Sequence, residues 1–348
     1  MIDDKRTFPE LSGYSLKEFE KKIQNMLLGI GIGDAFGAGY EFAFGKRDEF
    51  SYVDLLGYRH HSNPDFAHEP GMYTDDTQMS IAVSELIADD IGFSRENLAE
   101  YFVRAYKRDP AIGYAKGFKR FLESIESGEE FLERIRPRSE RNGAAMRSVP
   151  IGLIPDPAMV AEYARTNASV THNTPKGIAS SMGVALIAHF NFYERRMPDY
   201  SNLKGNILPY MEGIDKETTT YLLEVCAKES STRKDNSMDY TLLLGNKHKD
   251  AGVPCDGMRT LGAVAFILSR YDNPLDVLVE SIRLGGDTDS VASIALGINL
   301  MHNDVSEIPE RLYDGFTDHG FGKHYILQLG KRLANTIYGR CGENGKKN

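Results

Sequence analysis

Apolar residues recur at helical spacing along most of the chain, whereas sustained period-two alternation is scarce. The first helical segment opens with Ser15 and Glu18, which fit a capping box. The apolar stripe of this segment is formed by Phe19, Ile23, Met26 and Leu27, and that of the next by Met79, Ala82, Val83, Leu86 and Ile87. Further amphipathic segments cover residues 97–107, 118–125, 159–168, 178–189, 219–228, 258–269, 275–284, 290–299 and 325–337. The pattern predicts an all-α protein.

Three segments between the predicted helices are rich in polar residues, Gly or Pro and are expected to be long loops. They cover residues 44–72, 198–216 and 228–257. Residues 1–14 show no sustained period and are expected to form an N-terminal extension, and residues 342–348 to form a flexible tail. Residues 15–341 are expected to fold as one compact domain.

The net charge of the chain excludes one class of function. The 348 residues include 41 Lys and Arg against 50 Asp and Glu, a formal net charge of −9, which argues against a general nucleic-acid binder. Cys226, Cys255 and Cys341 show no paired spacing, so a reducing, cytoplasmic setting is expected. No run of 18 apolar residues occurs, so we expect no membrane span.

Two acidic clusters stand where amphipathic stripes begin. The first is Thr74-Asp75-Asp76-Thr77. Adjacent carboxylates at a helix start gain from the helix dipole, and Thr74 or Asp75 could cap free amides, so this cluster alone has an ordinary structural explanation. The second is Gly285-Gly286-Asp287-Thr288-Asp289-Ser290, in which the two glycines permit a sharp turn.

Together the clusters point to a site for hard cations. Mg²⁺ and Mn²⁺ prefer oxygen ligands, and the clusters could supply six, from Thr74, Asp75, Asp76, Asp287, Asp289 and Ser290. Four carboxylates packed closely would repel one another, and two divalent ions would remove that cost. The sequence therefore favours a cation site over two independent helix caps.

A third element lies at the end of the first predicted helix, Gly33-Asp34-Ala35-Phe36-Gly37-Ala38-Gly39-Tyr40-Glu41. Gly29, Gly33 and Gly37 are spaced by four and predict a close contact between two helices. Glu41, just beyond the glycines, is a candidate general acid or base.

In their order and spread along the chain, the three elements resemble the ADP-ribosylglycohydrolase family. Asn142-Gly143-Ala144-Ala145-Met146-Arg147 is similar to the family's central signature, and Thr171-His172-Asn173 to its Thr-His segment. The resemblance runs from Gly33 to Gly297. It implies a compact, single-domain orthogonal helical bundle around a cleft with two Mg²⁺ ions, or Mn²⁺ in their place.

The resemblance also implies roles for individual residues. The metal ligands would be Thr74, Asp75, Asp76, Asp287, Asp289 and Ser290, where many members have Thr in place of Ser290. The diphosphate loop would include Gly113, Tyr114 and Gly117, with Ala115 at a position that is commonly Gly; a simple break between two helices is the alternative. Ser139, Asn142 and His172 would contact substrate, with His172 stacking near the adenosine half. Asp109 could orient a guanidinium or simply end a helix before Pro110, and Glu140 and Arg141 depart from the family pattern.

The implied activity is hydrolysis of the bond between ribose C1 and an acceptor side chain of an ADP-ribosylated protein. Arginine is the expected acceptor. Glu41, Asp75 and Asp289 would be the catalytic residues. The alternative is an immunity or binding protein on the same scaffold, which occludes an ADP-ribosylating toxin through residues 1–14 and its loops. A third interpretation, phosphoryl transfer by two metal ions, lacks the Gly-x-x-x-x-Gly-Lys-Ser/Thr loop of many nucleotide-binding proteins.

Overall fold

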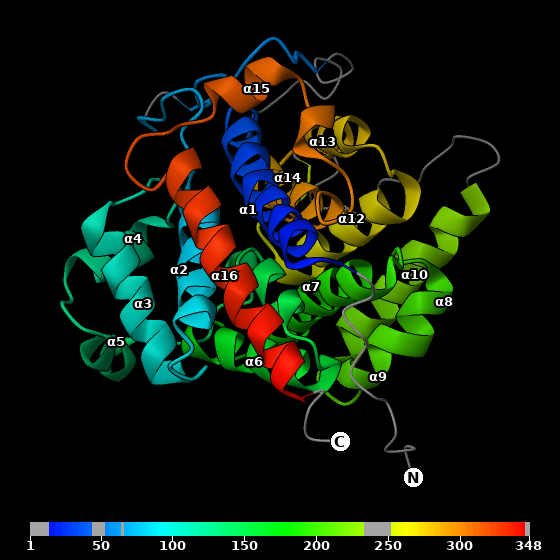
Figure 1. The fold of residues 1–348 in the computed structure, drawn as a ribbon, viewed down its shortest axis with the longest axis horizontal. Helices are drawn as coiled ribbons and strands as arrows, with labels where there is room; N and C mark the ends of the chain where they lie inside the picture. The colour runs from blue at the N-terminus through cyan, green and yellow to red at the C-terminus, as the bar shows by residue number, and fades with distance from the viewer. Residues whose placement is uncertain (1–13, 44–52, 64–65, 233–251, 345–348) are drawn as a thin grey trace.

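The computed structural model describes residues 14–43, 53–63, 66–232 and 252–344 (Figure 1). The predicted arm therefore lies outside the described residues except for Tyr14, as do parts of two predicted loops and residues 345–348 of the predicted tail. No strand forms among the described residues, so the all-α prediction is confirmed. No helix in these ranges is both long and apolar enough to cross a membrane.

The helices bear out most of the predicted segments and add several short turns. The α-helices are α1 (Leu16–Ala38), α2 (Asp75–Asp89), α3 (Arg95–Arg108), α4 (Lys116–Glu123), α5 (Gly128–Arg134), α6 (Pro157–Thr171), α7 (Pro175–Glu194), α8 (Tyr200–Asn202), α9 (Leu208–Met211), α10 (Lys216–Thr232), α12 (Gly257–Arg270), α13 (Pro274–Arg283), α14 (Thr288–Asn299), α15 (Glu310–Gly315) and α16 (Lys323–Asn344). Short 3-10 helices cover Asn142–Ala144, Val149–Leu153 and Val305–Glu307.

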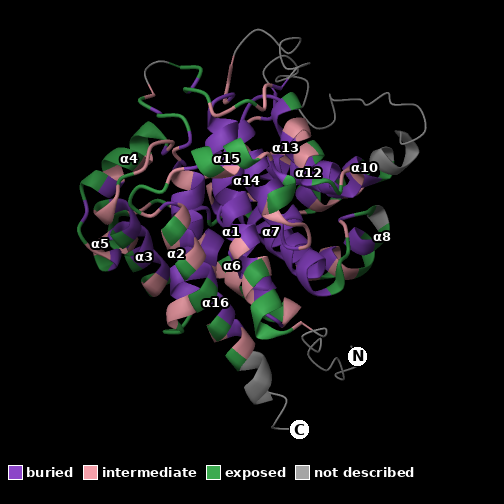
Figure 2. Ribbon diagram, turned by 45° about the horizontal axis from the view of Figure 1, so that its top comes forward, coloured by how far each residue is buried: buried purple, intermediate pink, exposed green. Residues whose placement is uncertain are grey.

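Helix α1 runs through the middle of the fold, packed against α14 and α16 (Figure 1). Its start follows the predicted capping box: the Ser15 hydroxyl accepts from the Glu18 amide at 3.3 Å, and the Glu18 carboxylate accepts from the Ser15 amide at 2.8 Å. From residue 25 to residue 38 every side chain of α1 is buried. Figure 2 shows the same buried character along α7 and α14, which lie in the core beside it.

The predicted glycine contact is confirmed as the joint between α1 and α14. A Cβ atom added to Gly29 would lie 2.8 Å from the carbonyl oxygen of Leu296, and one added to Gly37 would lie 2.5 Å from Cα of Asp289. Gly33 lies against the backbone of Ala292 in the same way. Because the two backbones approach this closely, the end of α1 is fixed beside the start of α14, which carries the second acidic cluster.

The prediction of a loop over residues 198–216 is wrong. This segment forms α8, a π-helical turn over Leu203–Ile207, and α9. Leu203, Ile207 and Met211 are fully buried at a spacing of four, so tertiary packing gives the segment the apolar face that a helix needs. Gly205 and Pro209 are exposed, off that face, and as residues that disfavour helix they conceal the pattern in the sequence.

Other elements also differ from the sequence-based expectation; α15, for example, lies outside every predicted segment. Helix α5 was not predicted; its N-cap Ser127 accepts a hydrogen bond from the amide of Glu130 at 3.2 Å. Helix α10 continues to Thr232, into the predicted loop 228–257. Helix α16 continues to Asn344, three residues beyond the expected domain end at residue 341.

Candidate active site

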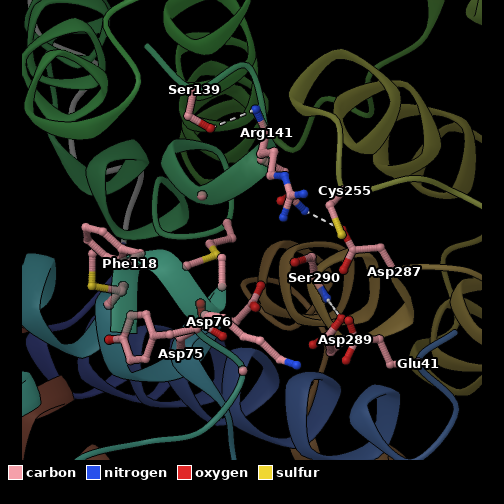
Figure 3. Close-up of a pocket in the computed structure, with 18 of the residues that line it drawn as sticks. Glu41, Asp75, Asp76, Phe118, Ser139, Arg141, Cys255, Asp287, Asp289 and Ser290 are labelled. Atoms are coloured by element: carbon pink, nitrogen blue, oxygen red, sulfur yellow. Dashed lines mark hydrogen bonds between the residues drawn. The ribbon is translucent and has the colours of Figure 1, made fainter. Parts of the chain in front are cut away.

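A cleft of about 820 Å³ opens where the starts of α2 and α14 meet the turn after α1 (Figure 3). Such a volume is within the usual range of small-molecule sites. The lining includes the acidic residues together with aromatic and basic residues, among them Phe118, Arg136 and Arg147. The cleft thus combines acidic, aromatic and basic side chains in one cavity.

The two acidic clusters predicted from the sequence meet in this cleft. Asp75 and Asp76 project from the first turn of α2, and Asp287, Asp289 and Ser290 lie across from them at the start of α14, with Glu41 beside Asp289 (Figure 3). Gly285 and Gly286 both have positive φ, 66° and 79°, which is the sharp turn that the two glycines predicted. Both helix N-termini therefore direct their positive ends toward one group of carboxylates.

Burial and mutual repulsion disfavour the ionised carboxylates. Burial, followed by the charges of neighbouring carboxylates, raises the pKa of Asp75, Asp76 and Asp289 well above the usual range. Burial likewise raises the pKa of Asp287 to about 6, although the amide of Asn142 donates to its Oδ2 at 2.6 Å. A positive charge placed among these groups would reverse the shifts.

The donor set fits a divalent cation. Oδ1 of Asp76 is buried and has no hydrogen-bond partner, which is costly unless a ligand satisfies it. Ligand atoms of Glu41, Cys255 and Asp287 all lie within 4.8 Å of one another. Mostly carboxylate and hydroxyl oxygens surround the space, as hard cations require.

Cys255 is a cleft residue that the sequence did not suggest. Its thiol is not in a disulfide, and burial together with the charges of Asp287 and Asp289 raises its pKa far above the usual range. It therefore stays protonated as the protein stands. The only sequence signal was its position shortly before α12 in a predicted loop.

Thr74 occupies the N-cap position of α2, but its side chain caps nothing on that helix. Its hydroxyl donates instead to Asp34 on α1, at 2.8 Å. Asp34 is fully buried, and its role was not predicted although the residue stands inside the glycine motif. Thr74 itself is buried and, unlike the other five expected metal ligands, does not line the cleft, although its side chain and the Asp75 carboxylate both lie against Gly113.

Glu41 is held by His61, another residue that the sequence did not suggest. Nε2 of His61 lies 2.8 Å from Oε2 of Glu41, and the amide of Asn63 donates to Nδ1 at 2.9 Å. Because an amide N–H can only donate, Nδ1 is the acceptor, and the neutral ring carries its hydrogen on Nε2, facing Glu41. The ring stacks on Phe66 with centroids 4.6 Å apart. Glu41 is thus fixed in direction by a packed side chain.

The expected diphosphate loop is only partly in place. Gly113, with φ of 97°, and Tyr114 line the cleft, and Gly113 lies directly against the Asp75 carboxylate. Gly117 lies in the first turn of α4 and does not line the cleft. Asp109 does not line it either: as C-cap of α3 it accepts from Gln78 through its backbone, and its carboxylate lies beside Gly320. Neither residue is therefore placed to touch a ligand in the cleft.

The remaining expected substrate residues, Ser139, Asn142 and His172, all line the cleft. Nδ1 of His172 lies 2.7 Å from the hydroxyl of Thr171, and burial, with the charge of Arg147, lowers its pKa to about 3. Arg147, buried under the cleft, donates to the Asn167 side chain at 2.6 Å and to Thr171 at 2.8 Å. The sequence placed Arg147 inside the central signature but gave it no role.

Comparison with known proteins agrees with the motifs. The family model for ADP-ribosylglycohydrolase matches residues 15–343. ADP-ribosylhydrolase ARH3 of Xenopus tropicalis is 29% identical over 325 residues, covering 83% of this chain and 89% of that protein. ADP-ribosylarginine hydrolase Tri1 of Serratia proteamaculans is 24% identical over 306 residues, covering 84% of this chain and 74% of that protein.

A solved structure shares the fold. It is described as an ADP-ribosylglycohydrolase-related protein complex, superposes with a TM-score of 0.60 at 19% identity, and covers 92% of this chain and 99% of its own. The family model spans nearly the whole described fold, including the helix starts that carry both acidic clusters. The chain therefore belongs to the ADP-ribosylglycohydrolase family and is a hydrolase that acts on ADP-ribosylated acceptors.

Proposed function

We propose that the protein is a Mg²⁺-dependent hydrolase that removes ADP-ribose from arginine side chains of modified proteins, at a site for two metal ions. The observation that carries the proposal is the convergence of four aspartates from the starts of α2 and α14, three of them buried and Asp75 half-buried, with one buried oxygen of Asp76 unsatisfied. Buried carboxylates without a counter-charge would only destabilise the fold. Two ions supply the counter-charge that the cluster lacks.

Six residues would hold the ions: Thr74, Asp75, Asp76, Asp287, Asp289 and Ser290. When bound, Mg²⁺ supplies a fixed positive charge that orients ribose hydroxyls and makes water more acidic. Mn²⁺ has similar ligand preferences and should substitute. Asp75 and Asp289 act in catalysis by keeping this arrangement fixed against the substrate ribose.

Glu41 is the proposed proton-transfer group. A water molecule adds to C1 of the ribose and gives a proton to the Glu41 carboxylate. The bond from C1 to the guanidinium nitrogen breaks, and that nitrogen takes the proton back from Glu41. The products are ADP-ribose and unmodified arginine, with no net change in protonation. His61 assists by presenting Glu41 in one orientation, since the donated hydrogen bond occupies Oε2 and leaves Oε1 available.

The choice of arginine rests on the character of the acidic part of the cleft. A guanidinium is a planar cation that pairs with carboxylates and stacks on aromatic rings, and here Glu41 lies beside the stacked rings of His61 and Phe66. One relative is named an ADP-ribosylarginine hydrolase, while the ARH3 relatives carry no acceptor in their names. A serine acceptor has no charge for these groups to recognise.

Other residues of the cleft suit the ADP half of the substrate. Arg147 carries a buried positive charge under the cleft, and the backbone at Gly113 and Tyr114, beside Asp75, offers amides for the proposed diphosphate. His172 stays neutral at physiological pH, because its pKa is about 3, and so presents an uncharged ring for stacking on the adenosine half. Ser139 and Asn142 complete this proposed substrate surface.

We further propose a cytoplasmic location and a catalytic domain of residues 15–341. Cys226 and Cys255 are not joined in disulfides, which is compatible with a reducing compartment. The alternative of a toxin-binding immunity protein would act through residues 1–14 and the loops, and of residues 1–14 only Tyr14 is among the described residues.

The test is an acceptor panel. Proteins carrying ADP-ribose on arginine and on serine, and nucleic acid carrying ADP-ribose, are incubated with the enzyme, with Mg²⁺ or with chelator. We expect release from arginine in Mg²⁺ and none with chelator. Equal release from all acceptors would overturn the arginine assignment, and full activity in chelator would overturn the metal site.

A further inference from the structure

Asp34 is a buried carboxylate that receives an unusual concentration of hydrogen bonds. It lies on α1 and is fully buried. Its Oδ2 accepts from the Thr74 amide at 2.9 Å, the Thr77 amide at 2.9 Å and the Thr77 hydroxyl at 2.6 Å. Its Oδ1 accepts from the Thr74 hydroxyl at 2.8 Å. Asp34 thus binds both threonines that flank the Asp75-Asp76 pair.

These contacts replace the ordinary cap of α2. In a helix that starts with a threonine N-cap, the hydroxyl of that residue usually accepts from the N3 amide. Here the N-cap is Thr74 and N3 is Thr77, yet the N3 amide donates to Asp34. Asp34, on α1, therefore caps the start of α2, and the Thr74 hydroxyl makes no capping bond to its own helix.

Because the Thr74 hydroxyl does not cap α2, its lone pairs stay available for a ligand of the cleft. A hydroxyl has one hydrogen and two lone pairs, and a carboxylate can only accept. With its hydrogen directed to Asp34, the Thr74 oxygen keeps its lone pairs for another partner. A hydroxyl that instead capped its own helix would use a lone pair on the N3 amide and leave its hydrogen free to point toward a cation.

We infer that Asp34 is a positioning residue for the metal site, which holds the Thr74 hydroxyl as an acceptor toward the bound cation. The inference rests on the proposed function, because Thr74 is a ligand only if the clusters bind metal. It adds a residue from the middle of α1 to the site. It also gives a reason for a buried acid beside the Asp75-Asp76 pair, where a neutral side chain would be enough for simple capping.

A purely structural role would be to fasten α2 to α1. The two threonines separate the roles, because both donate a hydroxyl and an amide to Asp34 and only Thr74 is a proposed ligand. Thr77→Val removes one hydroxyl bond to Asp34 and leaves Thr74 untouched. Thr74→Val removes the hydroxyl through which Asp34 would act. Thr77→Val is therefore the matched control.

The experiment measures binding of Mn²⁺ by counting free Mn²⁺ with electron paramagnetic resonance. The proteins are the wild type, Asp34→Asn, Thr74→Val, Thr77→Val, and the double variant of Asp34→Asn with Thr74→Val. Asp34→Asn is expected to weaken the tighter site by about tenfold or more, as removal of a ligand's supporting partner usually does. Thr77→Val should stay within about twofold, and the double variant should bind no more weakly than Thr74→Val.

Two results would overturn the inference while leaving the proposed function intact. One is wild-type affinity in folded Asp34→Asn; the other is an equal loss for Asp34→Asn with and without the Thr74 hydroxyl. A wild-type protein that binds no Mn²⁺ would overturn the metal site and the inference together. Should Asp34→Asn not fold, exchange of the Thr74 hydroxyl hydrogen in the wild type is followed by NMR: protection retained in saturating Mg²⁺ supports the inference, and protection lost contradicts it.

Discussion

The carboxylates of four aspartates determine which ligands the acidic part of the cleft can bind. Asp76, Asp287 and Asp289 are buried and Asp75 is half-buried beside them, and the raised pKa values of all four show that their ionised forms are unfavourable without a counter-ion. The same property makes the cluster a strong site once a cation is present. Function and stability therefore conflict at these residues.

Replacement of Asp289 by asparagine should separate its effect on function from its effect on stability. In Asp289→Asn we expect hydrolysis to fall by at least about 100-fold, because loss of a ligand should exceed the effect of losing an outer partner. In chelator the variant should unfold at a higher temperature than the wild type, since one buried charge is gone. Asp276→Asn, which removes an exposed acid from the first turn of α13, is the control and should change neither. An active Asp289→Asn would count against the site.

The contact between His61 and Glu41 gives a second test at one residue. His61→Ala should lower kcat about tenfold with little change in KM, because Glu41 would lose its fixed orientation. His61→Gln keeps a nitrogen donor near the position of Nε2 and should recover much of the loss. The neighbouring His60, whose Nδ1 contacts the backbone oxygen of His68, is the control. Equal kcat in His61→Ala and the wild type would show that Glu41 needs no such support.

At the scale of the helices, the close contact of α1 with α14 positions the site. Gly37 is packed on the backbone at Asp289, so a methyl group there has no flexible side chain to displace. Gly37→Ala should cost about 1–3 kcal/mol in the free energy of unfolding and reduce activity as well. Gly339→Ala in α16 meets no atom within 4 Å and should stabilise the helix by about 0.5–1 kcal/mol. Urea unfolding and turnover of both variants check this, and a harmless Gly37→Ala would contradict the close contact.

The contact of α7 with the Val149–Leu153 turn carries a pH dependence that is independent of the metal site. Nδ1 of His189 lies 2.9 Å from the backbone oxygen of Ile154, and burial lowers the pKa of His189 to about 4. Below the unfolded value of 6.5 the unfolded chain binds a proton that the folded protein does not, so stability is present above that pH and is lost as pH falls toward 4. The loss amounts to about 2–3 kcal/mol across this window.

His189→Asn removes this titration. The variant should be less stable than the wild type at pH 7, and the difference should shrink by about 1–2 kcal/mol between pH 7 and pH 5. Urea unfolding at the two pH values measures it. His324→Asn, at an exposed histidine on α16, should show no such change. A constant difference between His189→Asn and the wild type would mean that the pKa of His189 is the same in the folded and unfolded states.

At the scale of the whole molecule, cation binding should increase the free energy of unfolding. A ligand that binds only the folded state adds about 2.7 kcal/mol at one hundred times its Kd. Thermal unfolding should therefore shift upward with Mg²⁺ in the wild type and revert with chelator. Asp289→Asn should lose most of this shift. An identical shift in the two proteins would place the stabilising Mg²⁺ elsewhere.

Much of the fold could be predicted because its long helices carry regular apolar stripes, as in residues 79–87. Short elements could not: α5 spans Gly128–Arg134, and the turn at residues 203–211 contains Gly205 and Pro209, which disfavour helix. Such segments become helical through burial, which local spacing does not reveal.

The same contrast holds for the site. Each acidic cluster is local in sequence, so its helix start could be predicted. The contact of Asp34 with Thr74 joins residues 40 apart, and that of His61 with Glu41 joins residues 20 apart. No local rule gives such pairs, and Asp109 shows the converse, since its place in the chain suggested a site residue that the packing of α3 directs elsewhere.

The central claim is that the four aspartates form a metal site for hydrolysis of ADP-ribosylarginine. Its most direct measurement is the rate of ADP-ribose release from an arginine-modified protein in Mg²⁺, in chelator, and by Asp289→Asn in Mg²⁺. We predict release in the first condition alone, with activity restored when Mg²⁺ is returned to the chelated enzyme. Release that persists in chelator or in Asp289→Asn would contradict the account.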